Sequence, residues 1–523
     1  MNPTLIILCI SAYFLILFII SYITGKNDSN ESFFLGNRNS PWFVIAYGMI
    51  GTTLSGITFI SVPGWVASSQ FSYMQMVFGF FVGYFIIARI LLPLYYRLEL
   101  TSIYTYLRDR FGYSSYKTGS VLFLFSRTIG ASFRLYLIAS VLQFALFDSW
   151  NVPFALTVAI TISLIWIYTY RGGIKTIIWT DALQTTFMLS TVFIIAFTLM
   201  KNMNLDAFSL IQEIRDSDYS KMFFFEDWTD KKYFFKQFFS GVFMAIVMTG
   251  LDQDQMQKNL SCRNLKDAQK NMFTFSSILI VVDLIFLSVG ALLYIYSNKY
   301  GVIIPEDPDM LFPNIALNSG LPSYVGILFL IGIIAAAYSS ADSALTSLTT
   351  SFCVDIIEFE KQDPEKQIKT RKYVHFLMSL VLFGVIILFN AINDDSVIKS
   401  LFTVAGYTYG PLLGMFTFGL FTKWEVNDKW VPLVAILSPI LCYILTLYIP
   451  FGFELLILNG LITFVGLYLL KLTFAYSTKL LLNHIVSLKP ALLKKSSLCI
   501  PLNSFNKPTL IWSVNISLAT KTP

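Results

Sequence analysis

Long apolar segments, separated by short polar loops, follow one another along almost the whole chain. A helix needs roughly 20 apolar residues to cross the hydrocarbon core of a bilayer, and most of these segments are that long. The pattern predicts an all-α integral membrane protein with about thirteen spans, at residues 4–24, 41–69, 73–96, 118–147, 152–170, 177–200, 233–252, 273–297, 324–356, 373–392, 397–421, 430–449 and 453–474. An odd number of spans places the two ends of the chain on opposite sides of the membrane.

Basic residues are concentrated in every second loop of this pattern. These loops contain Lys26 and Arg38; Arg97, Arg108, Arg110 and Lys117; Arg171 and Lys175; Lys258, Arg263, Lys266 and Lys270; and Lys361, Lys366, Lys369, Arg371 and Lys372. Short cytoplasmic loops carry an excess of lysine and arginine. We therefore expect an outside N-terminus, a cytoplasmic C-terminus and a multi-pass protein of the plasma or inner membrane.

The composition agrees with a membrane protein and limits its partners. Of 523 residues, 55% are hydrophobic and 13% are charged, and the mean hydropathy is +0.66, whereas about a quarter of a soluble protein is charged. The net charge of +6 comes from residues 476–523, which hold six lysines and no acid. We interpret residues 1–475 as one transmembrane domain and 476–523 as a basic, lipid-facing cytoplasmic tail, with no need for a nucleic-acid partner.

Few residues are suited to covalent chemistry. The five cysteines, Cys9, Cys262, Cys353, Cys442 and Cys499, lack metal-ligand spacing and an evident pairing scheme. The two histidines fall in predicted cytoplasmic segments. A convergent catalytic set is therefore not expected, and the chain is not predicted to be an enzyme.

A stripe of small and hydroxyl residues lies within the span at 324–356. Ala336, Ser339, Ser340 and Ser343 follow the i, i+3, i+4, i+7 spacing of one helix face, and Asp342 borders it. Hydrocarbon cannot satisfy such groups, so the stripe faces protein, water or an ion. Close helix packing and an ion site are both consistent with it. Asp342 favours the ion site, because a carboxylate at membrane depth is costly.

The span at 41–69 is rich in residues that interrupt helices. Glycines and hydroxyl residues crowd positions 48–56, and Pro63-Gly64 follows. Unwinding there would free backbone carbonyls of the kind that coordinate cations in transporters. Gly51, Leu54, Ser55 and Thr58 share one face, as the wall of an ion or substrate site would, although a glycine-rich packing face would have the same pattern.

Two arginines and one aspartate lie within predicted spans, where a lipid-facing position would be apolar. Arg127 and Arg134 lie on one face of the fourth span, and Asp181 lies just inside the sixth. A buried guanidinium binds a carboxylate in a bidentate fashion. The arginines therefore bind an anionic solute or serve as counter-ions for Asp181 or Asp342, and Asp181 is either an interfacial cap or an ion ligand.

Several motifs together resemble the sodium:solute symporter family. They are Phe33-Phe34-Leu35-Gly36-Asn37-Arg38, Arg171-Gly172-Gly173-Ile174-Lys175, Trp179-Thr180-Asp181-Ala182-Leu183-Gln184, Asp252-Gln253-Asp254-Gln255-Met256-Gln257, and the Ala-x-x-Ser-Ser pattern at Ala336. The similarity runs from about residue 5 to 474. It implies a LeuT-like fold, with inverted five-helix repeats at about 41–200 and 233–421 and extra helices before and after them.

The resemblance also implies a set of site residues. The sodium ligands would be the backbone carbonyls of Gly51, Leu54 and Ala336 and the hydroxyls of Ser339 and Ser340. A second cation site would use Asp181, Ser339 and Ser343, with Asp342 at a position where relatives often carry a small hydroxyl residue. Apart from the resemblance, we expect Ser55, Thr58, residues near Tyr73 to Phe80, Arg134 and Tyr407 to line the solute pocket. The resemblance implies a role for Arg134 alone, as the match of the arginine that holds the carboxylate of acidic sugars in some relatives.

The function we expect is sodium-coupled import of a small organic solute by alternating access. Arg134 favours a sugar acid or another carboxylate, and the aromatic and hydroxyl residues suit a sugar. Two alternatives stay open: a proton-coupled transporter that uses Asp342 or Asp181, and a membrane sensor that transports nothing. The expected partners are sodium, the solute and the lipid bilayer, and a single copy is expected to function.

Overall fold

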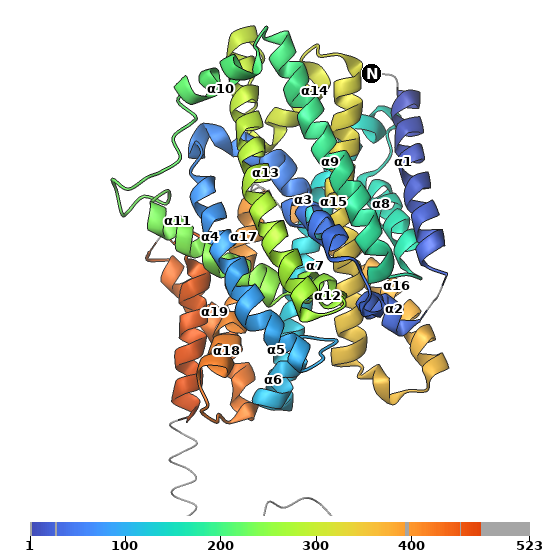
Figure 1. The fold of residues 1–523 in the computed structure, drawn as a ribbon, viewed down its shortest axis with the longest axis vertical. Coiled ribbons are helices and arrows are strands. Elements are labelled where there is room, and N and C mark those ends of the chain that lie inside the picture. Colours follow the sequence, from blue (N-terminus) through green and yellow to red (C-terminus); the bar gives the residue numbers. More distant parts are fainter. Residues whose placement is uncertain (1–2, 27–28, 393–396, 450, 472–523) are drawn as a thin grey trace, which may run out of the picture. The chain divides into compact units, whose positions relative to one another are not determined.

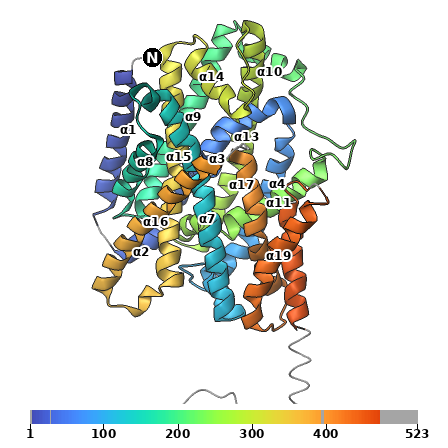
Figure 2. The same cartoon turned by 180° about the vertical axis from the view of Figure 1, so that it is seen from behind.

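The computed structural model describes residues 3–26, 29–392, 397–449 and 451–471, and helices form most of this part of the chain. Figures 1 and 2 show the helices side by side in one bundle, with α1 and α19 on opposite sides of it. The predicted tail at 476–523 lies outside the described residues. Within them, the only bridge between extended residues joins Ser40 to Cys262, which confirms the all-α prediction.

Every predicted span contains helix. The long elements are α1 (Pro3–Thr24), α3 (Trp42–Ser69), α4 (Tyr73–Ile86) with α5 (Leu92–Arg97), α7 (Tyr113–Leu142), α8 (Phe154–Thr169), α9 (Ile174–Asn202), α11 (Phe234–Ala245), α13 (Leu265–Tyr300), α15 (Ser323–Ser351), α16 (Pro364–Ile392), α17 (Val397–Thr408), α18 (Gly410–Phe421), α19 (Val431–Thr446) and the helix Leu455–Lys471. In the described residues, eight to ten helices are long and apolar enough to cross a membrane, and three shorter apolar helices accompany them. The number thirteen therefore stays a prediction.

Short helices occupy segments that the sequence pattern left as loops. They are α2 (Asn30–Leu35), α6 (Thr105–Arg110), α10 (Ala207–Asp216), α12 (Gln253–Leu260) and α14 (Leu311–Asn318). Side-chain caps start several of these elements: Asp206 accepts the backbone N–H of Ser209 before α10, and Asp252 accepts that of Asp254 before α12. The most consequential is α12, because all of its residues are buried.

Helix α15 is the most buried long helix of the bundle. Every residue from Gly332 to Ser351 is buried, and the helix contacts α3, α7, α8, α9 and α16. A helix that is covered on all sides has no lipid-facing stripe. Its polar residues therefore face other helices, as the serine stripe predicted.

Two of the predicted spans are sharply bent. In α3, the segments Trp42–Gly56 and Thr58–Ser69 meet at 57°, and Ser55 has a left-handed φ of 53° with ψ 171°. The segments Phe234–Gly250 and Gln253–Leu260 meet at 65°. The left-handed backbone of Ser55, a non-glycine residue, costs about 1–3 kcal/mol, and strain of this kind is typical of functional sites. Each bent segment opens one of the two predicted repeats, whose boundaries stay predictions.

Glycines let α4 and α11 touch along their backbones. A Cβ added at Gly241 of α11 would lie 2.2 Å from the carbonyl oxygen of Met76, and one added at Gly79 of α4 would lie 2.1 Å from that of Phe238. Backbone atoms cannot move aside as a flexible side chain does. This pair of helices therefore depends on glycine at both positions.

We predict that Gly241→Leu destabilises the protein by at least about 1–3 kcal/mol, because the added side chain forces α11 away from α4. The matched control is Gly384→Leu on α16, where an added Cβ meets nothing within 4 Å. Apparent melting temperatures of the purified full-length variants measure the effect. Equal melting temperatures for the two variants contradict the proposed close contact.

Candidate functional site

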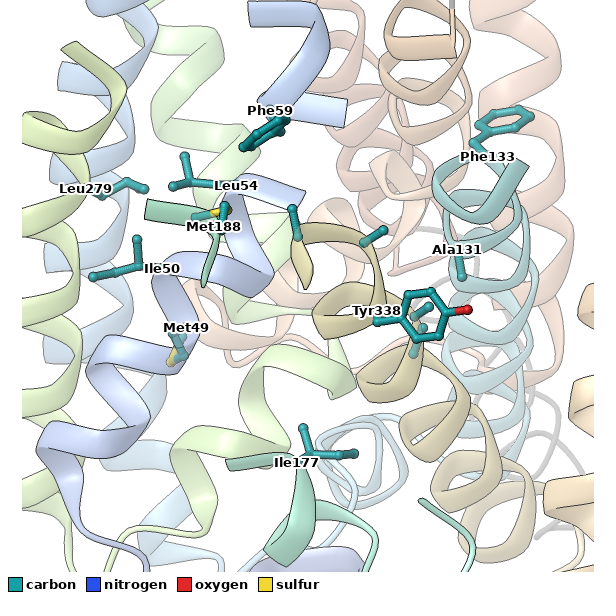
Figure 3. Close-up of a cluster of buried hydrophobic side chains, with 14 of the residues drawn as sticks. Met49, Ile50, Leu54, Phe59, Ala131, Phe133, Ile177, Met188, Leu279 and Tyr338 are labelled. Carbon is teal, nitrogen blue, oxygen red and sulfur yellow. The ribbon is translucent and has the colours of Figure 1, made fainter. Parts of the chain in front are cut away.

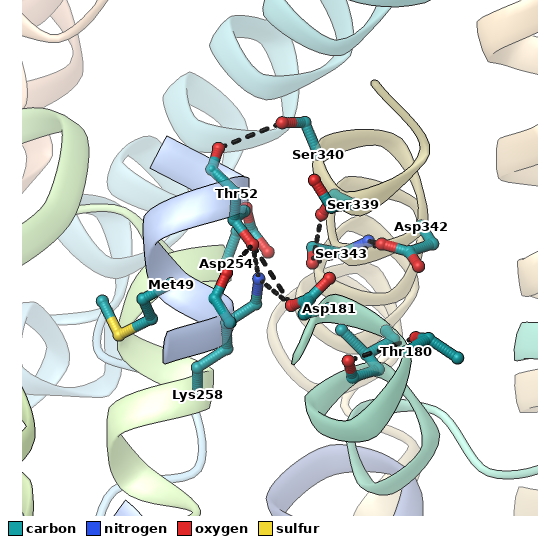
Figure 4. A network of polar contacts seen from close by, with 12 residues as sticks. Met49, Thr52, Thr180, Asp181, Asp254, Lys258, Ser339, Ser340, Asp342 and Ser343 are labelled. Atoms are coloured by element: carbon teal, nitrogen blue, oxygen red, sulfur yellow. Dashed lines mark hydrogen bonds and ion pairs between the residues drawn. The ribbon is translucent and has the colours of Figure 1, made fainter. Parts of the chain in front are cut away.

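The serine stripe of α15 faces the bend of α3 (Figure 4). The Ser340 hydroxyl donates a hydrogen bond of 3.0 Å to the backbone carbonyl of Thr52. The Ser339 hydroxyl donates one of 2.9 Å to the carbonyl of Ala336. All of these residues are buried. The stripe thus joins α15 to the carbonyl-rich end of the first half of α3.

Unwinding at Ser55 explains why a carbonyl of α3 is available to α15. Helical carbonyls bond the N–H group four residues later, and the turn of the chain at Ser55 interrupts that series for the preceding residues. Gly51 lies on the side of α9, where an added Cβ would be 2.3 Å from the Thr185 hydroxyl oxygen. Leu54 lines an adjacent cavity. Neutral carbonyl and hydroxyl oxygens of this kind suit a monovalent cation, since divalent ions usually take carboxylates.

A polar network lies beside the stripe and contains Asp181 of α9. The Lys258 ammonium of α12 donates to the Asp181 carboxylate at 2.7 Å and to the Thr52 hydroxyl at 2.6 Å. The Thr52 hydroxyl is itself 3.2 Å from the same carboxylate oxygen. Figure 4 shows Lys258 reaching between α3 and α9. The three side chains are buried, so α3, α9 and α12 share one ion-paired contact.

The counter-ions proposed for Asp181 and Asp342 are wrong. Asp181 pairs with Lys258 rather than with an arginine. Asp342 accepts a hydrogen bond of 2.9 Å from the Tyr168 hydroxyl and one of 2.6 Å from the backbone N–H of Ser343. The reason is that α12 is folded back into the bundle after the 65° bend, so Lys258 is a buried side chain rather than a charge in a cytoplasmic loop.

Arg127 and Arg134, seven residues apart on α7, have different partners. The Arg127 guanidinium is ion-paired with Asp254 and lies 3.9 Å from Asp252. Asp252 also accepts a hydrogen bond of 2.5 Å from the Tyr409 hydroxyl. Arg134 has neither a hydrogen bond nor an ion pair with any described residue, although it is only 7% exposed. Arg127 is therefore a structural counter-ion, and Arg134 is free to meet a ligand.

Most of the residues predicted to contact the solute line one cavity. Leu54, Ser55, Thr58 and Arg134 line it, together with Tyr73, Phe80, Tyr84, Thr249, Gln255, Leu279 and Asp283. Apolar residues of α3, including Ile50 and Leu54, pack nearby with Leu279 of α13 (Figure 3). The cavity thus lies directly beside the bend of α3 and is walled by α3, α4, α7, α11, α12 and α13.

The structure separates Tyr407 from this cavity. Tyr407 lines another hollow with Gly406, Thr446 and Glu454, and its hydroxyl is 3.2 Å from that of Thr446. This residue of α17 faces α19, and its ring lies 6.4 Å from that of Tyr443. Tyr407 was therefore wrongly grouped with Ser55, Thr58 and Arg134.

Three residues near the site did not enter the predicted set. Lys258 and Asp254 were assigned to a loop, because the short polar helix α12 carries no apolar pattern. Asp283 had a usable signal: it is an isolated acid in the middle of the apolar segment 273–297, where a charge is costly and usually functional.

Comparisons with known proteins agree with this geometry. The family model described as the sodium:solute symporter family matches residues 33–429. The chain belongs to the sodium:solute symporter family. It is 25% identical to the sodium/sialic acid symporter NanT of Aliivibrio fischeri, over 80% of this chain and 83% of the relative. It is also 25% identical to the sodium/sialic acid symporter SiaT of Proteus mirabilis, over 77% and 81%.

A solved structure supports the fold of this symporter. The outward-open, substrate-bound structure of a sodium-coupled sialic acid symporter matches with a TM-score of 0.77 at 20% identity, over 89% of this chain and 97% of the other. The nucleobase-cation-symport-1 transporter Mhp1 matches with a TM-score of 0.55 at 14% identity, over 87% and 96%. The predicted LeuT-like fold is confirmed. The protein is a multi-pass membrane transporter that couples solute to sodium, and it is not an enzyme.

We predict that replacing the two arginines of α7 has unequal effects on stability. Arg127→Met should lower the free energy of unfolding by about 3–5 kcal/mol, because it leaves the buried carboxylates of Asp252 and Asp254 without their cation. Arg134→Met, the matched control, should cost little stability, since Arg134 has no ion-pair partner among the described residues. Thermal unfolding of the purified variants measures both. Equal losses contradict the assignment of Arg127 as a counter-ion.

Proposed function

We propose that this symporter imports a small organic carboxylate, such as a sugar acid, together with sodium. The observation that carries the proposal is Arg134, a buried guanidinium without a protein partner that lines the cavity beside the bend of α3. Guanidinium groups match carboxylates in charge and in bidentate geometry. The named solute of two similar relatives, sialic acid, is such a sugar acid.

The sodium ion is proposed to bind between α3 and α15. Its ligands would be the carbonyls of Gly51, Leu54 and Ala336 and the hydroxyls of Ser339 and Ser340. The hydrogen bond from Ser340 to the Thr52 carbonyl supports this placement, because it shows that hydroxyls of α15 reach the freed carbonyls of α3. A cation bound there would hold the bend that precedes Ser55 and Thr58, two residues of the cavity wall.

Coupling follows from this proximity. Bound sodium would fix the conformation of α3, and α3 forms part of the wall of the solute cavity. Each ligand therefore stabilises the conformation that binds the other ligand. The sodium concentration gradient supplies the driving force, and the membrane potential adds about 2.3 kcal/mol per 100 mV for each net positive charge that moves inward. We place the protein in the plasma or inner membrane as a single working copy, with its N-terminus outside and its C-terminus in the cytoplasm. Among the described residues, no specific contact supports proton coupling or a sensor role.

Uptake by proteoliposomes tests the proposal. Full-length protein is reconstituted, and uptake of labelled sialic acid and gluconate is measured with a sodium gradient or with choline in place of sodium. We expect accumulation only with sodium. Uptake that is the same in choline overturns the proposed sodium coupling.

We predict that Ser339→Ala raises the sodium concentration for half-maximal uptake about tenfold, the effect of losing roughly 1.4 kcal/mol from one ligand. The matched control is Ser347→Ala, two turns further along α15. Ser347 is also fully buried and donates to the carbonyl of Ala344 at 3.0 Å, as Ser339 does to Ala336 at 2.9 Å. The same sodium dependence in both variants assigns the stripe to helix packing alone.

A further inference from the structure

The cavity beside α3 contains two buried ionisable side chains, one basic and one acidic, that form no ion pair with any described residue. Arg134 of α7 and Asp283 of α13 both line it, and they are 7% and 1% exposed. The Arg134 Nε and the Asp283 Oδ1 have no hydrogen-bond partner, and neither side chain forms an ion pair within the described part of the chain. Figure 3 places Leu279 of α13 and Ala131 of α7 on opposite sides of Leu54.

Neighbouring buried charges each have at least one polar partner within the protein. The pairs are Arg127 with Asp254, Asp181 with Lys258, and Asp342 with the Tyr168 hydroxyl. Burying a charge without a partner is costly. Three arginine or aspartate side chains line the cavity: Arg127 is ion-paired with Asp254, whereas Arg134 and Asp283 have no ion pair among the described residues. A ligand that meets Arg134 and Asp283 would remove this cost.

We infer that Asp283 determines which carboxylates the transporter accepts. The solute, on this inference, carries a carboxylate for Arg134 and, at its other end, a hydrogen-bond donor for Asp283: a hydroxyl or an ammonium group. A simple fatty acid satisfies Arg134 but leaves the Asp283 carboxylate desolvated and unpaired. The inference rests on the proposed function, since it concerns the same cavity, and it narrows the solute from any carboxylate to a donor-bearing one.

Three acids with six-carbon chains test the inference: gluconate with hydroxyls, 6-aminohexanoate with an ammonium group, and hexanoate with neither. Their half-saturating concentrations are read from thermal stabilisation of the purified full-length protein in sodium. At least one donor-bearing acid should bind about tenfold or more tightly than hexanoate, the effect of one charge-assisted hydrogen bond. Equal behaviour of all three acids, including no stabilisation, overturns the inference.

Variants show whether Asp283 is the cause. Asp283→Leu is nearly isosteric and removes the acceptor, so the preference over hexanoate should disappear. Asp283→Asn keeps an acceptor oxygen but no charge, so it should retain gluconate and weaken 6-aminohexanoate. Asp267→Asn, near the start of the same helix and outside the cavity lining, should behave like the wild type. A preference that persists in Asp283→Leu while uptake still requires sodium overturns the role of Asp283 and leaves the proposed function intact.

A second inference comes independently from Lys258. The second cation site implied by the sequence resemblance needs the carboxylate of Asp181, but the Lys258 ammonium lies 2.7 Å from that carboxylate and is itself 1% exposed. A free sodium ion there would be repelled by the fixed charge. The Lys258 ammonium therefore already supplies one positive charge to this carboxylate through Oδ2, and only its Oδ1 has no hydrogen-bond partner. We propose that Lys258 is a tethered cation in place of a second sodium ion, so that one sodium ion moves with each solute.

The sodium dependence of uptake tests this proposal. Wild-type protein should show a Hill coefficient of about one for sodium, and Lys258→Met should raise it above one, because the freed carboxylate of Asp181 can then bind a second ion. The double variant Lys258→Met with Asp181→Asn should return to about one. Parallel uptake of labelled sodium and labelled solute by wild-type proteoliposomes measures the sodium-to-solute ratio, so the proposal is tested even where a variant folds poorly. A wild-type ratio of two overturns it.

Discussion

The central physical constraint in this symporter is the interruption of α3 inside the bundle. Backbone carbonyls that lose their helical partners in a membrane interior must be satisfied by protein, water or an ion. Here the bend at Ser55 presents carbonyls to a helix that is buried on all sides, and Ser340 of α15 donates to one of them at 3.0 Å. The same bend shapes the cavity wall at Ser55 and Thr58. Ion coordination and solute binding therefore depend on one local conformation.

The second bend positions two buried charged side chains of α12. After it, α12 returns into the interior and brings Asp254 to Arg127 and Lys258 to Asp181. Each contact joins α12 to a helix of the first predicted repeat, α7 or α9. Since breaking a buried ion pair is strongly destabilising, these pairs fix the relative positions of the helices around the cavity. Movement between states therefore has to preserve or exchange these pairs.

Apolar length and residue spacing were sufficient to predict the long helices and the buried stripe from Ala336 to Ser343, and they gave a bend near Ser55 as one of two interpretations, the other being a glycine-rich packing face. They could not predict α12, because its interior position comes from tertiary folding of a polar segment that resembles a loop. The wrong counter-ion for Asp181 followed from that error, because Lys258 was expected in a loop. Tyr407 was misplaced for a related reason: helix periodicity gives the face of a residue along α17, but not which neighbouring helix covers that face.

Burial alone does not identify the functional charges of this protein, because structural ion pairs are equally buried. The informative property is the absence of a protein partner combined with a position on a cavity. Arg127 and Asp181 are buried and paired, so the folded chain already accounts for them. Arg134 and Asp283 are buried and, within the described residues, unpaired at one cavity. A solute that pairs with both side chains would offset the desolvation cost that each of them bears in the folded protein. Solutes that can pair with only one of them would bind more weakly, and this difference would give the transporter its specificity.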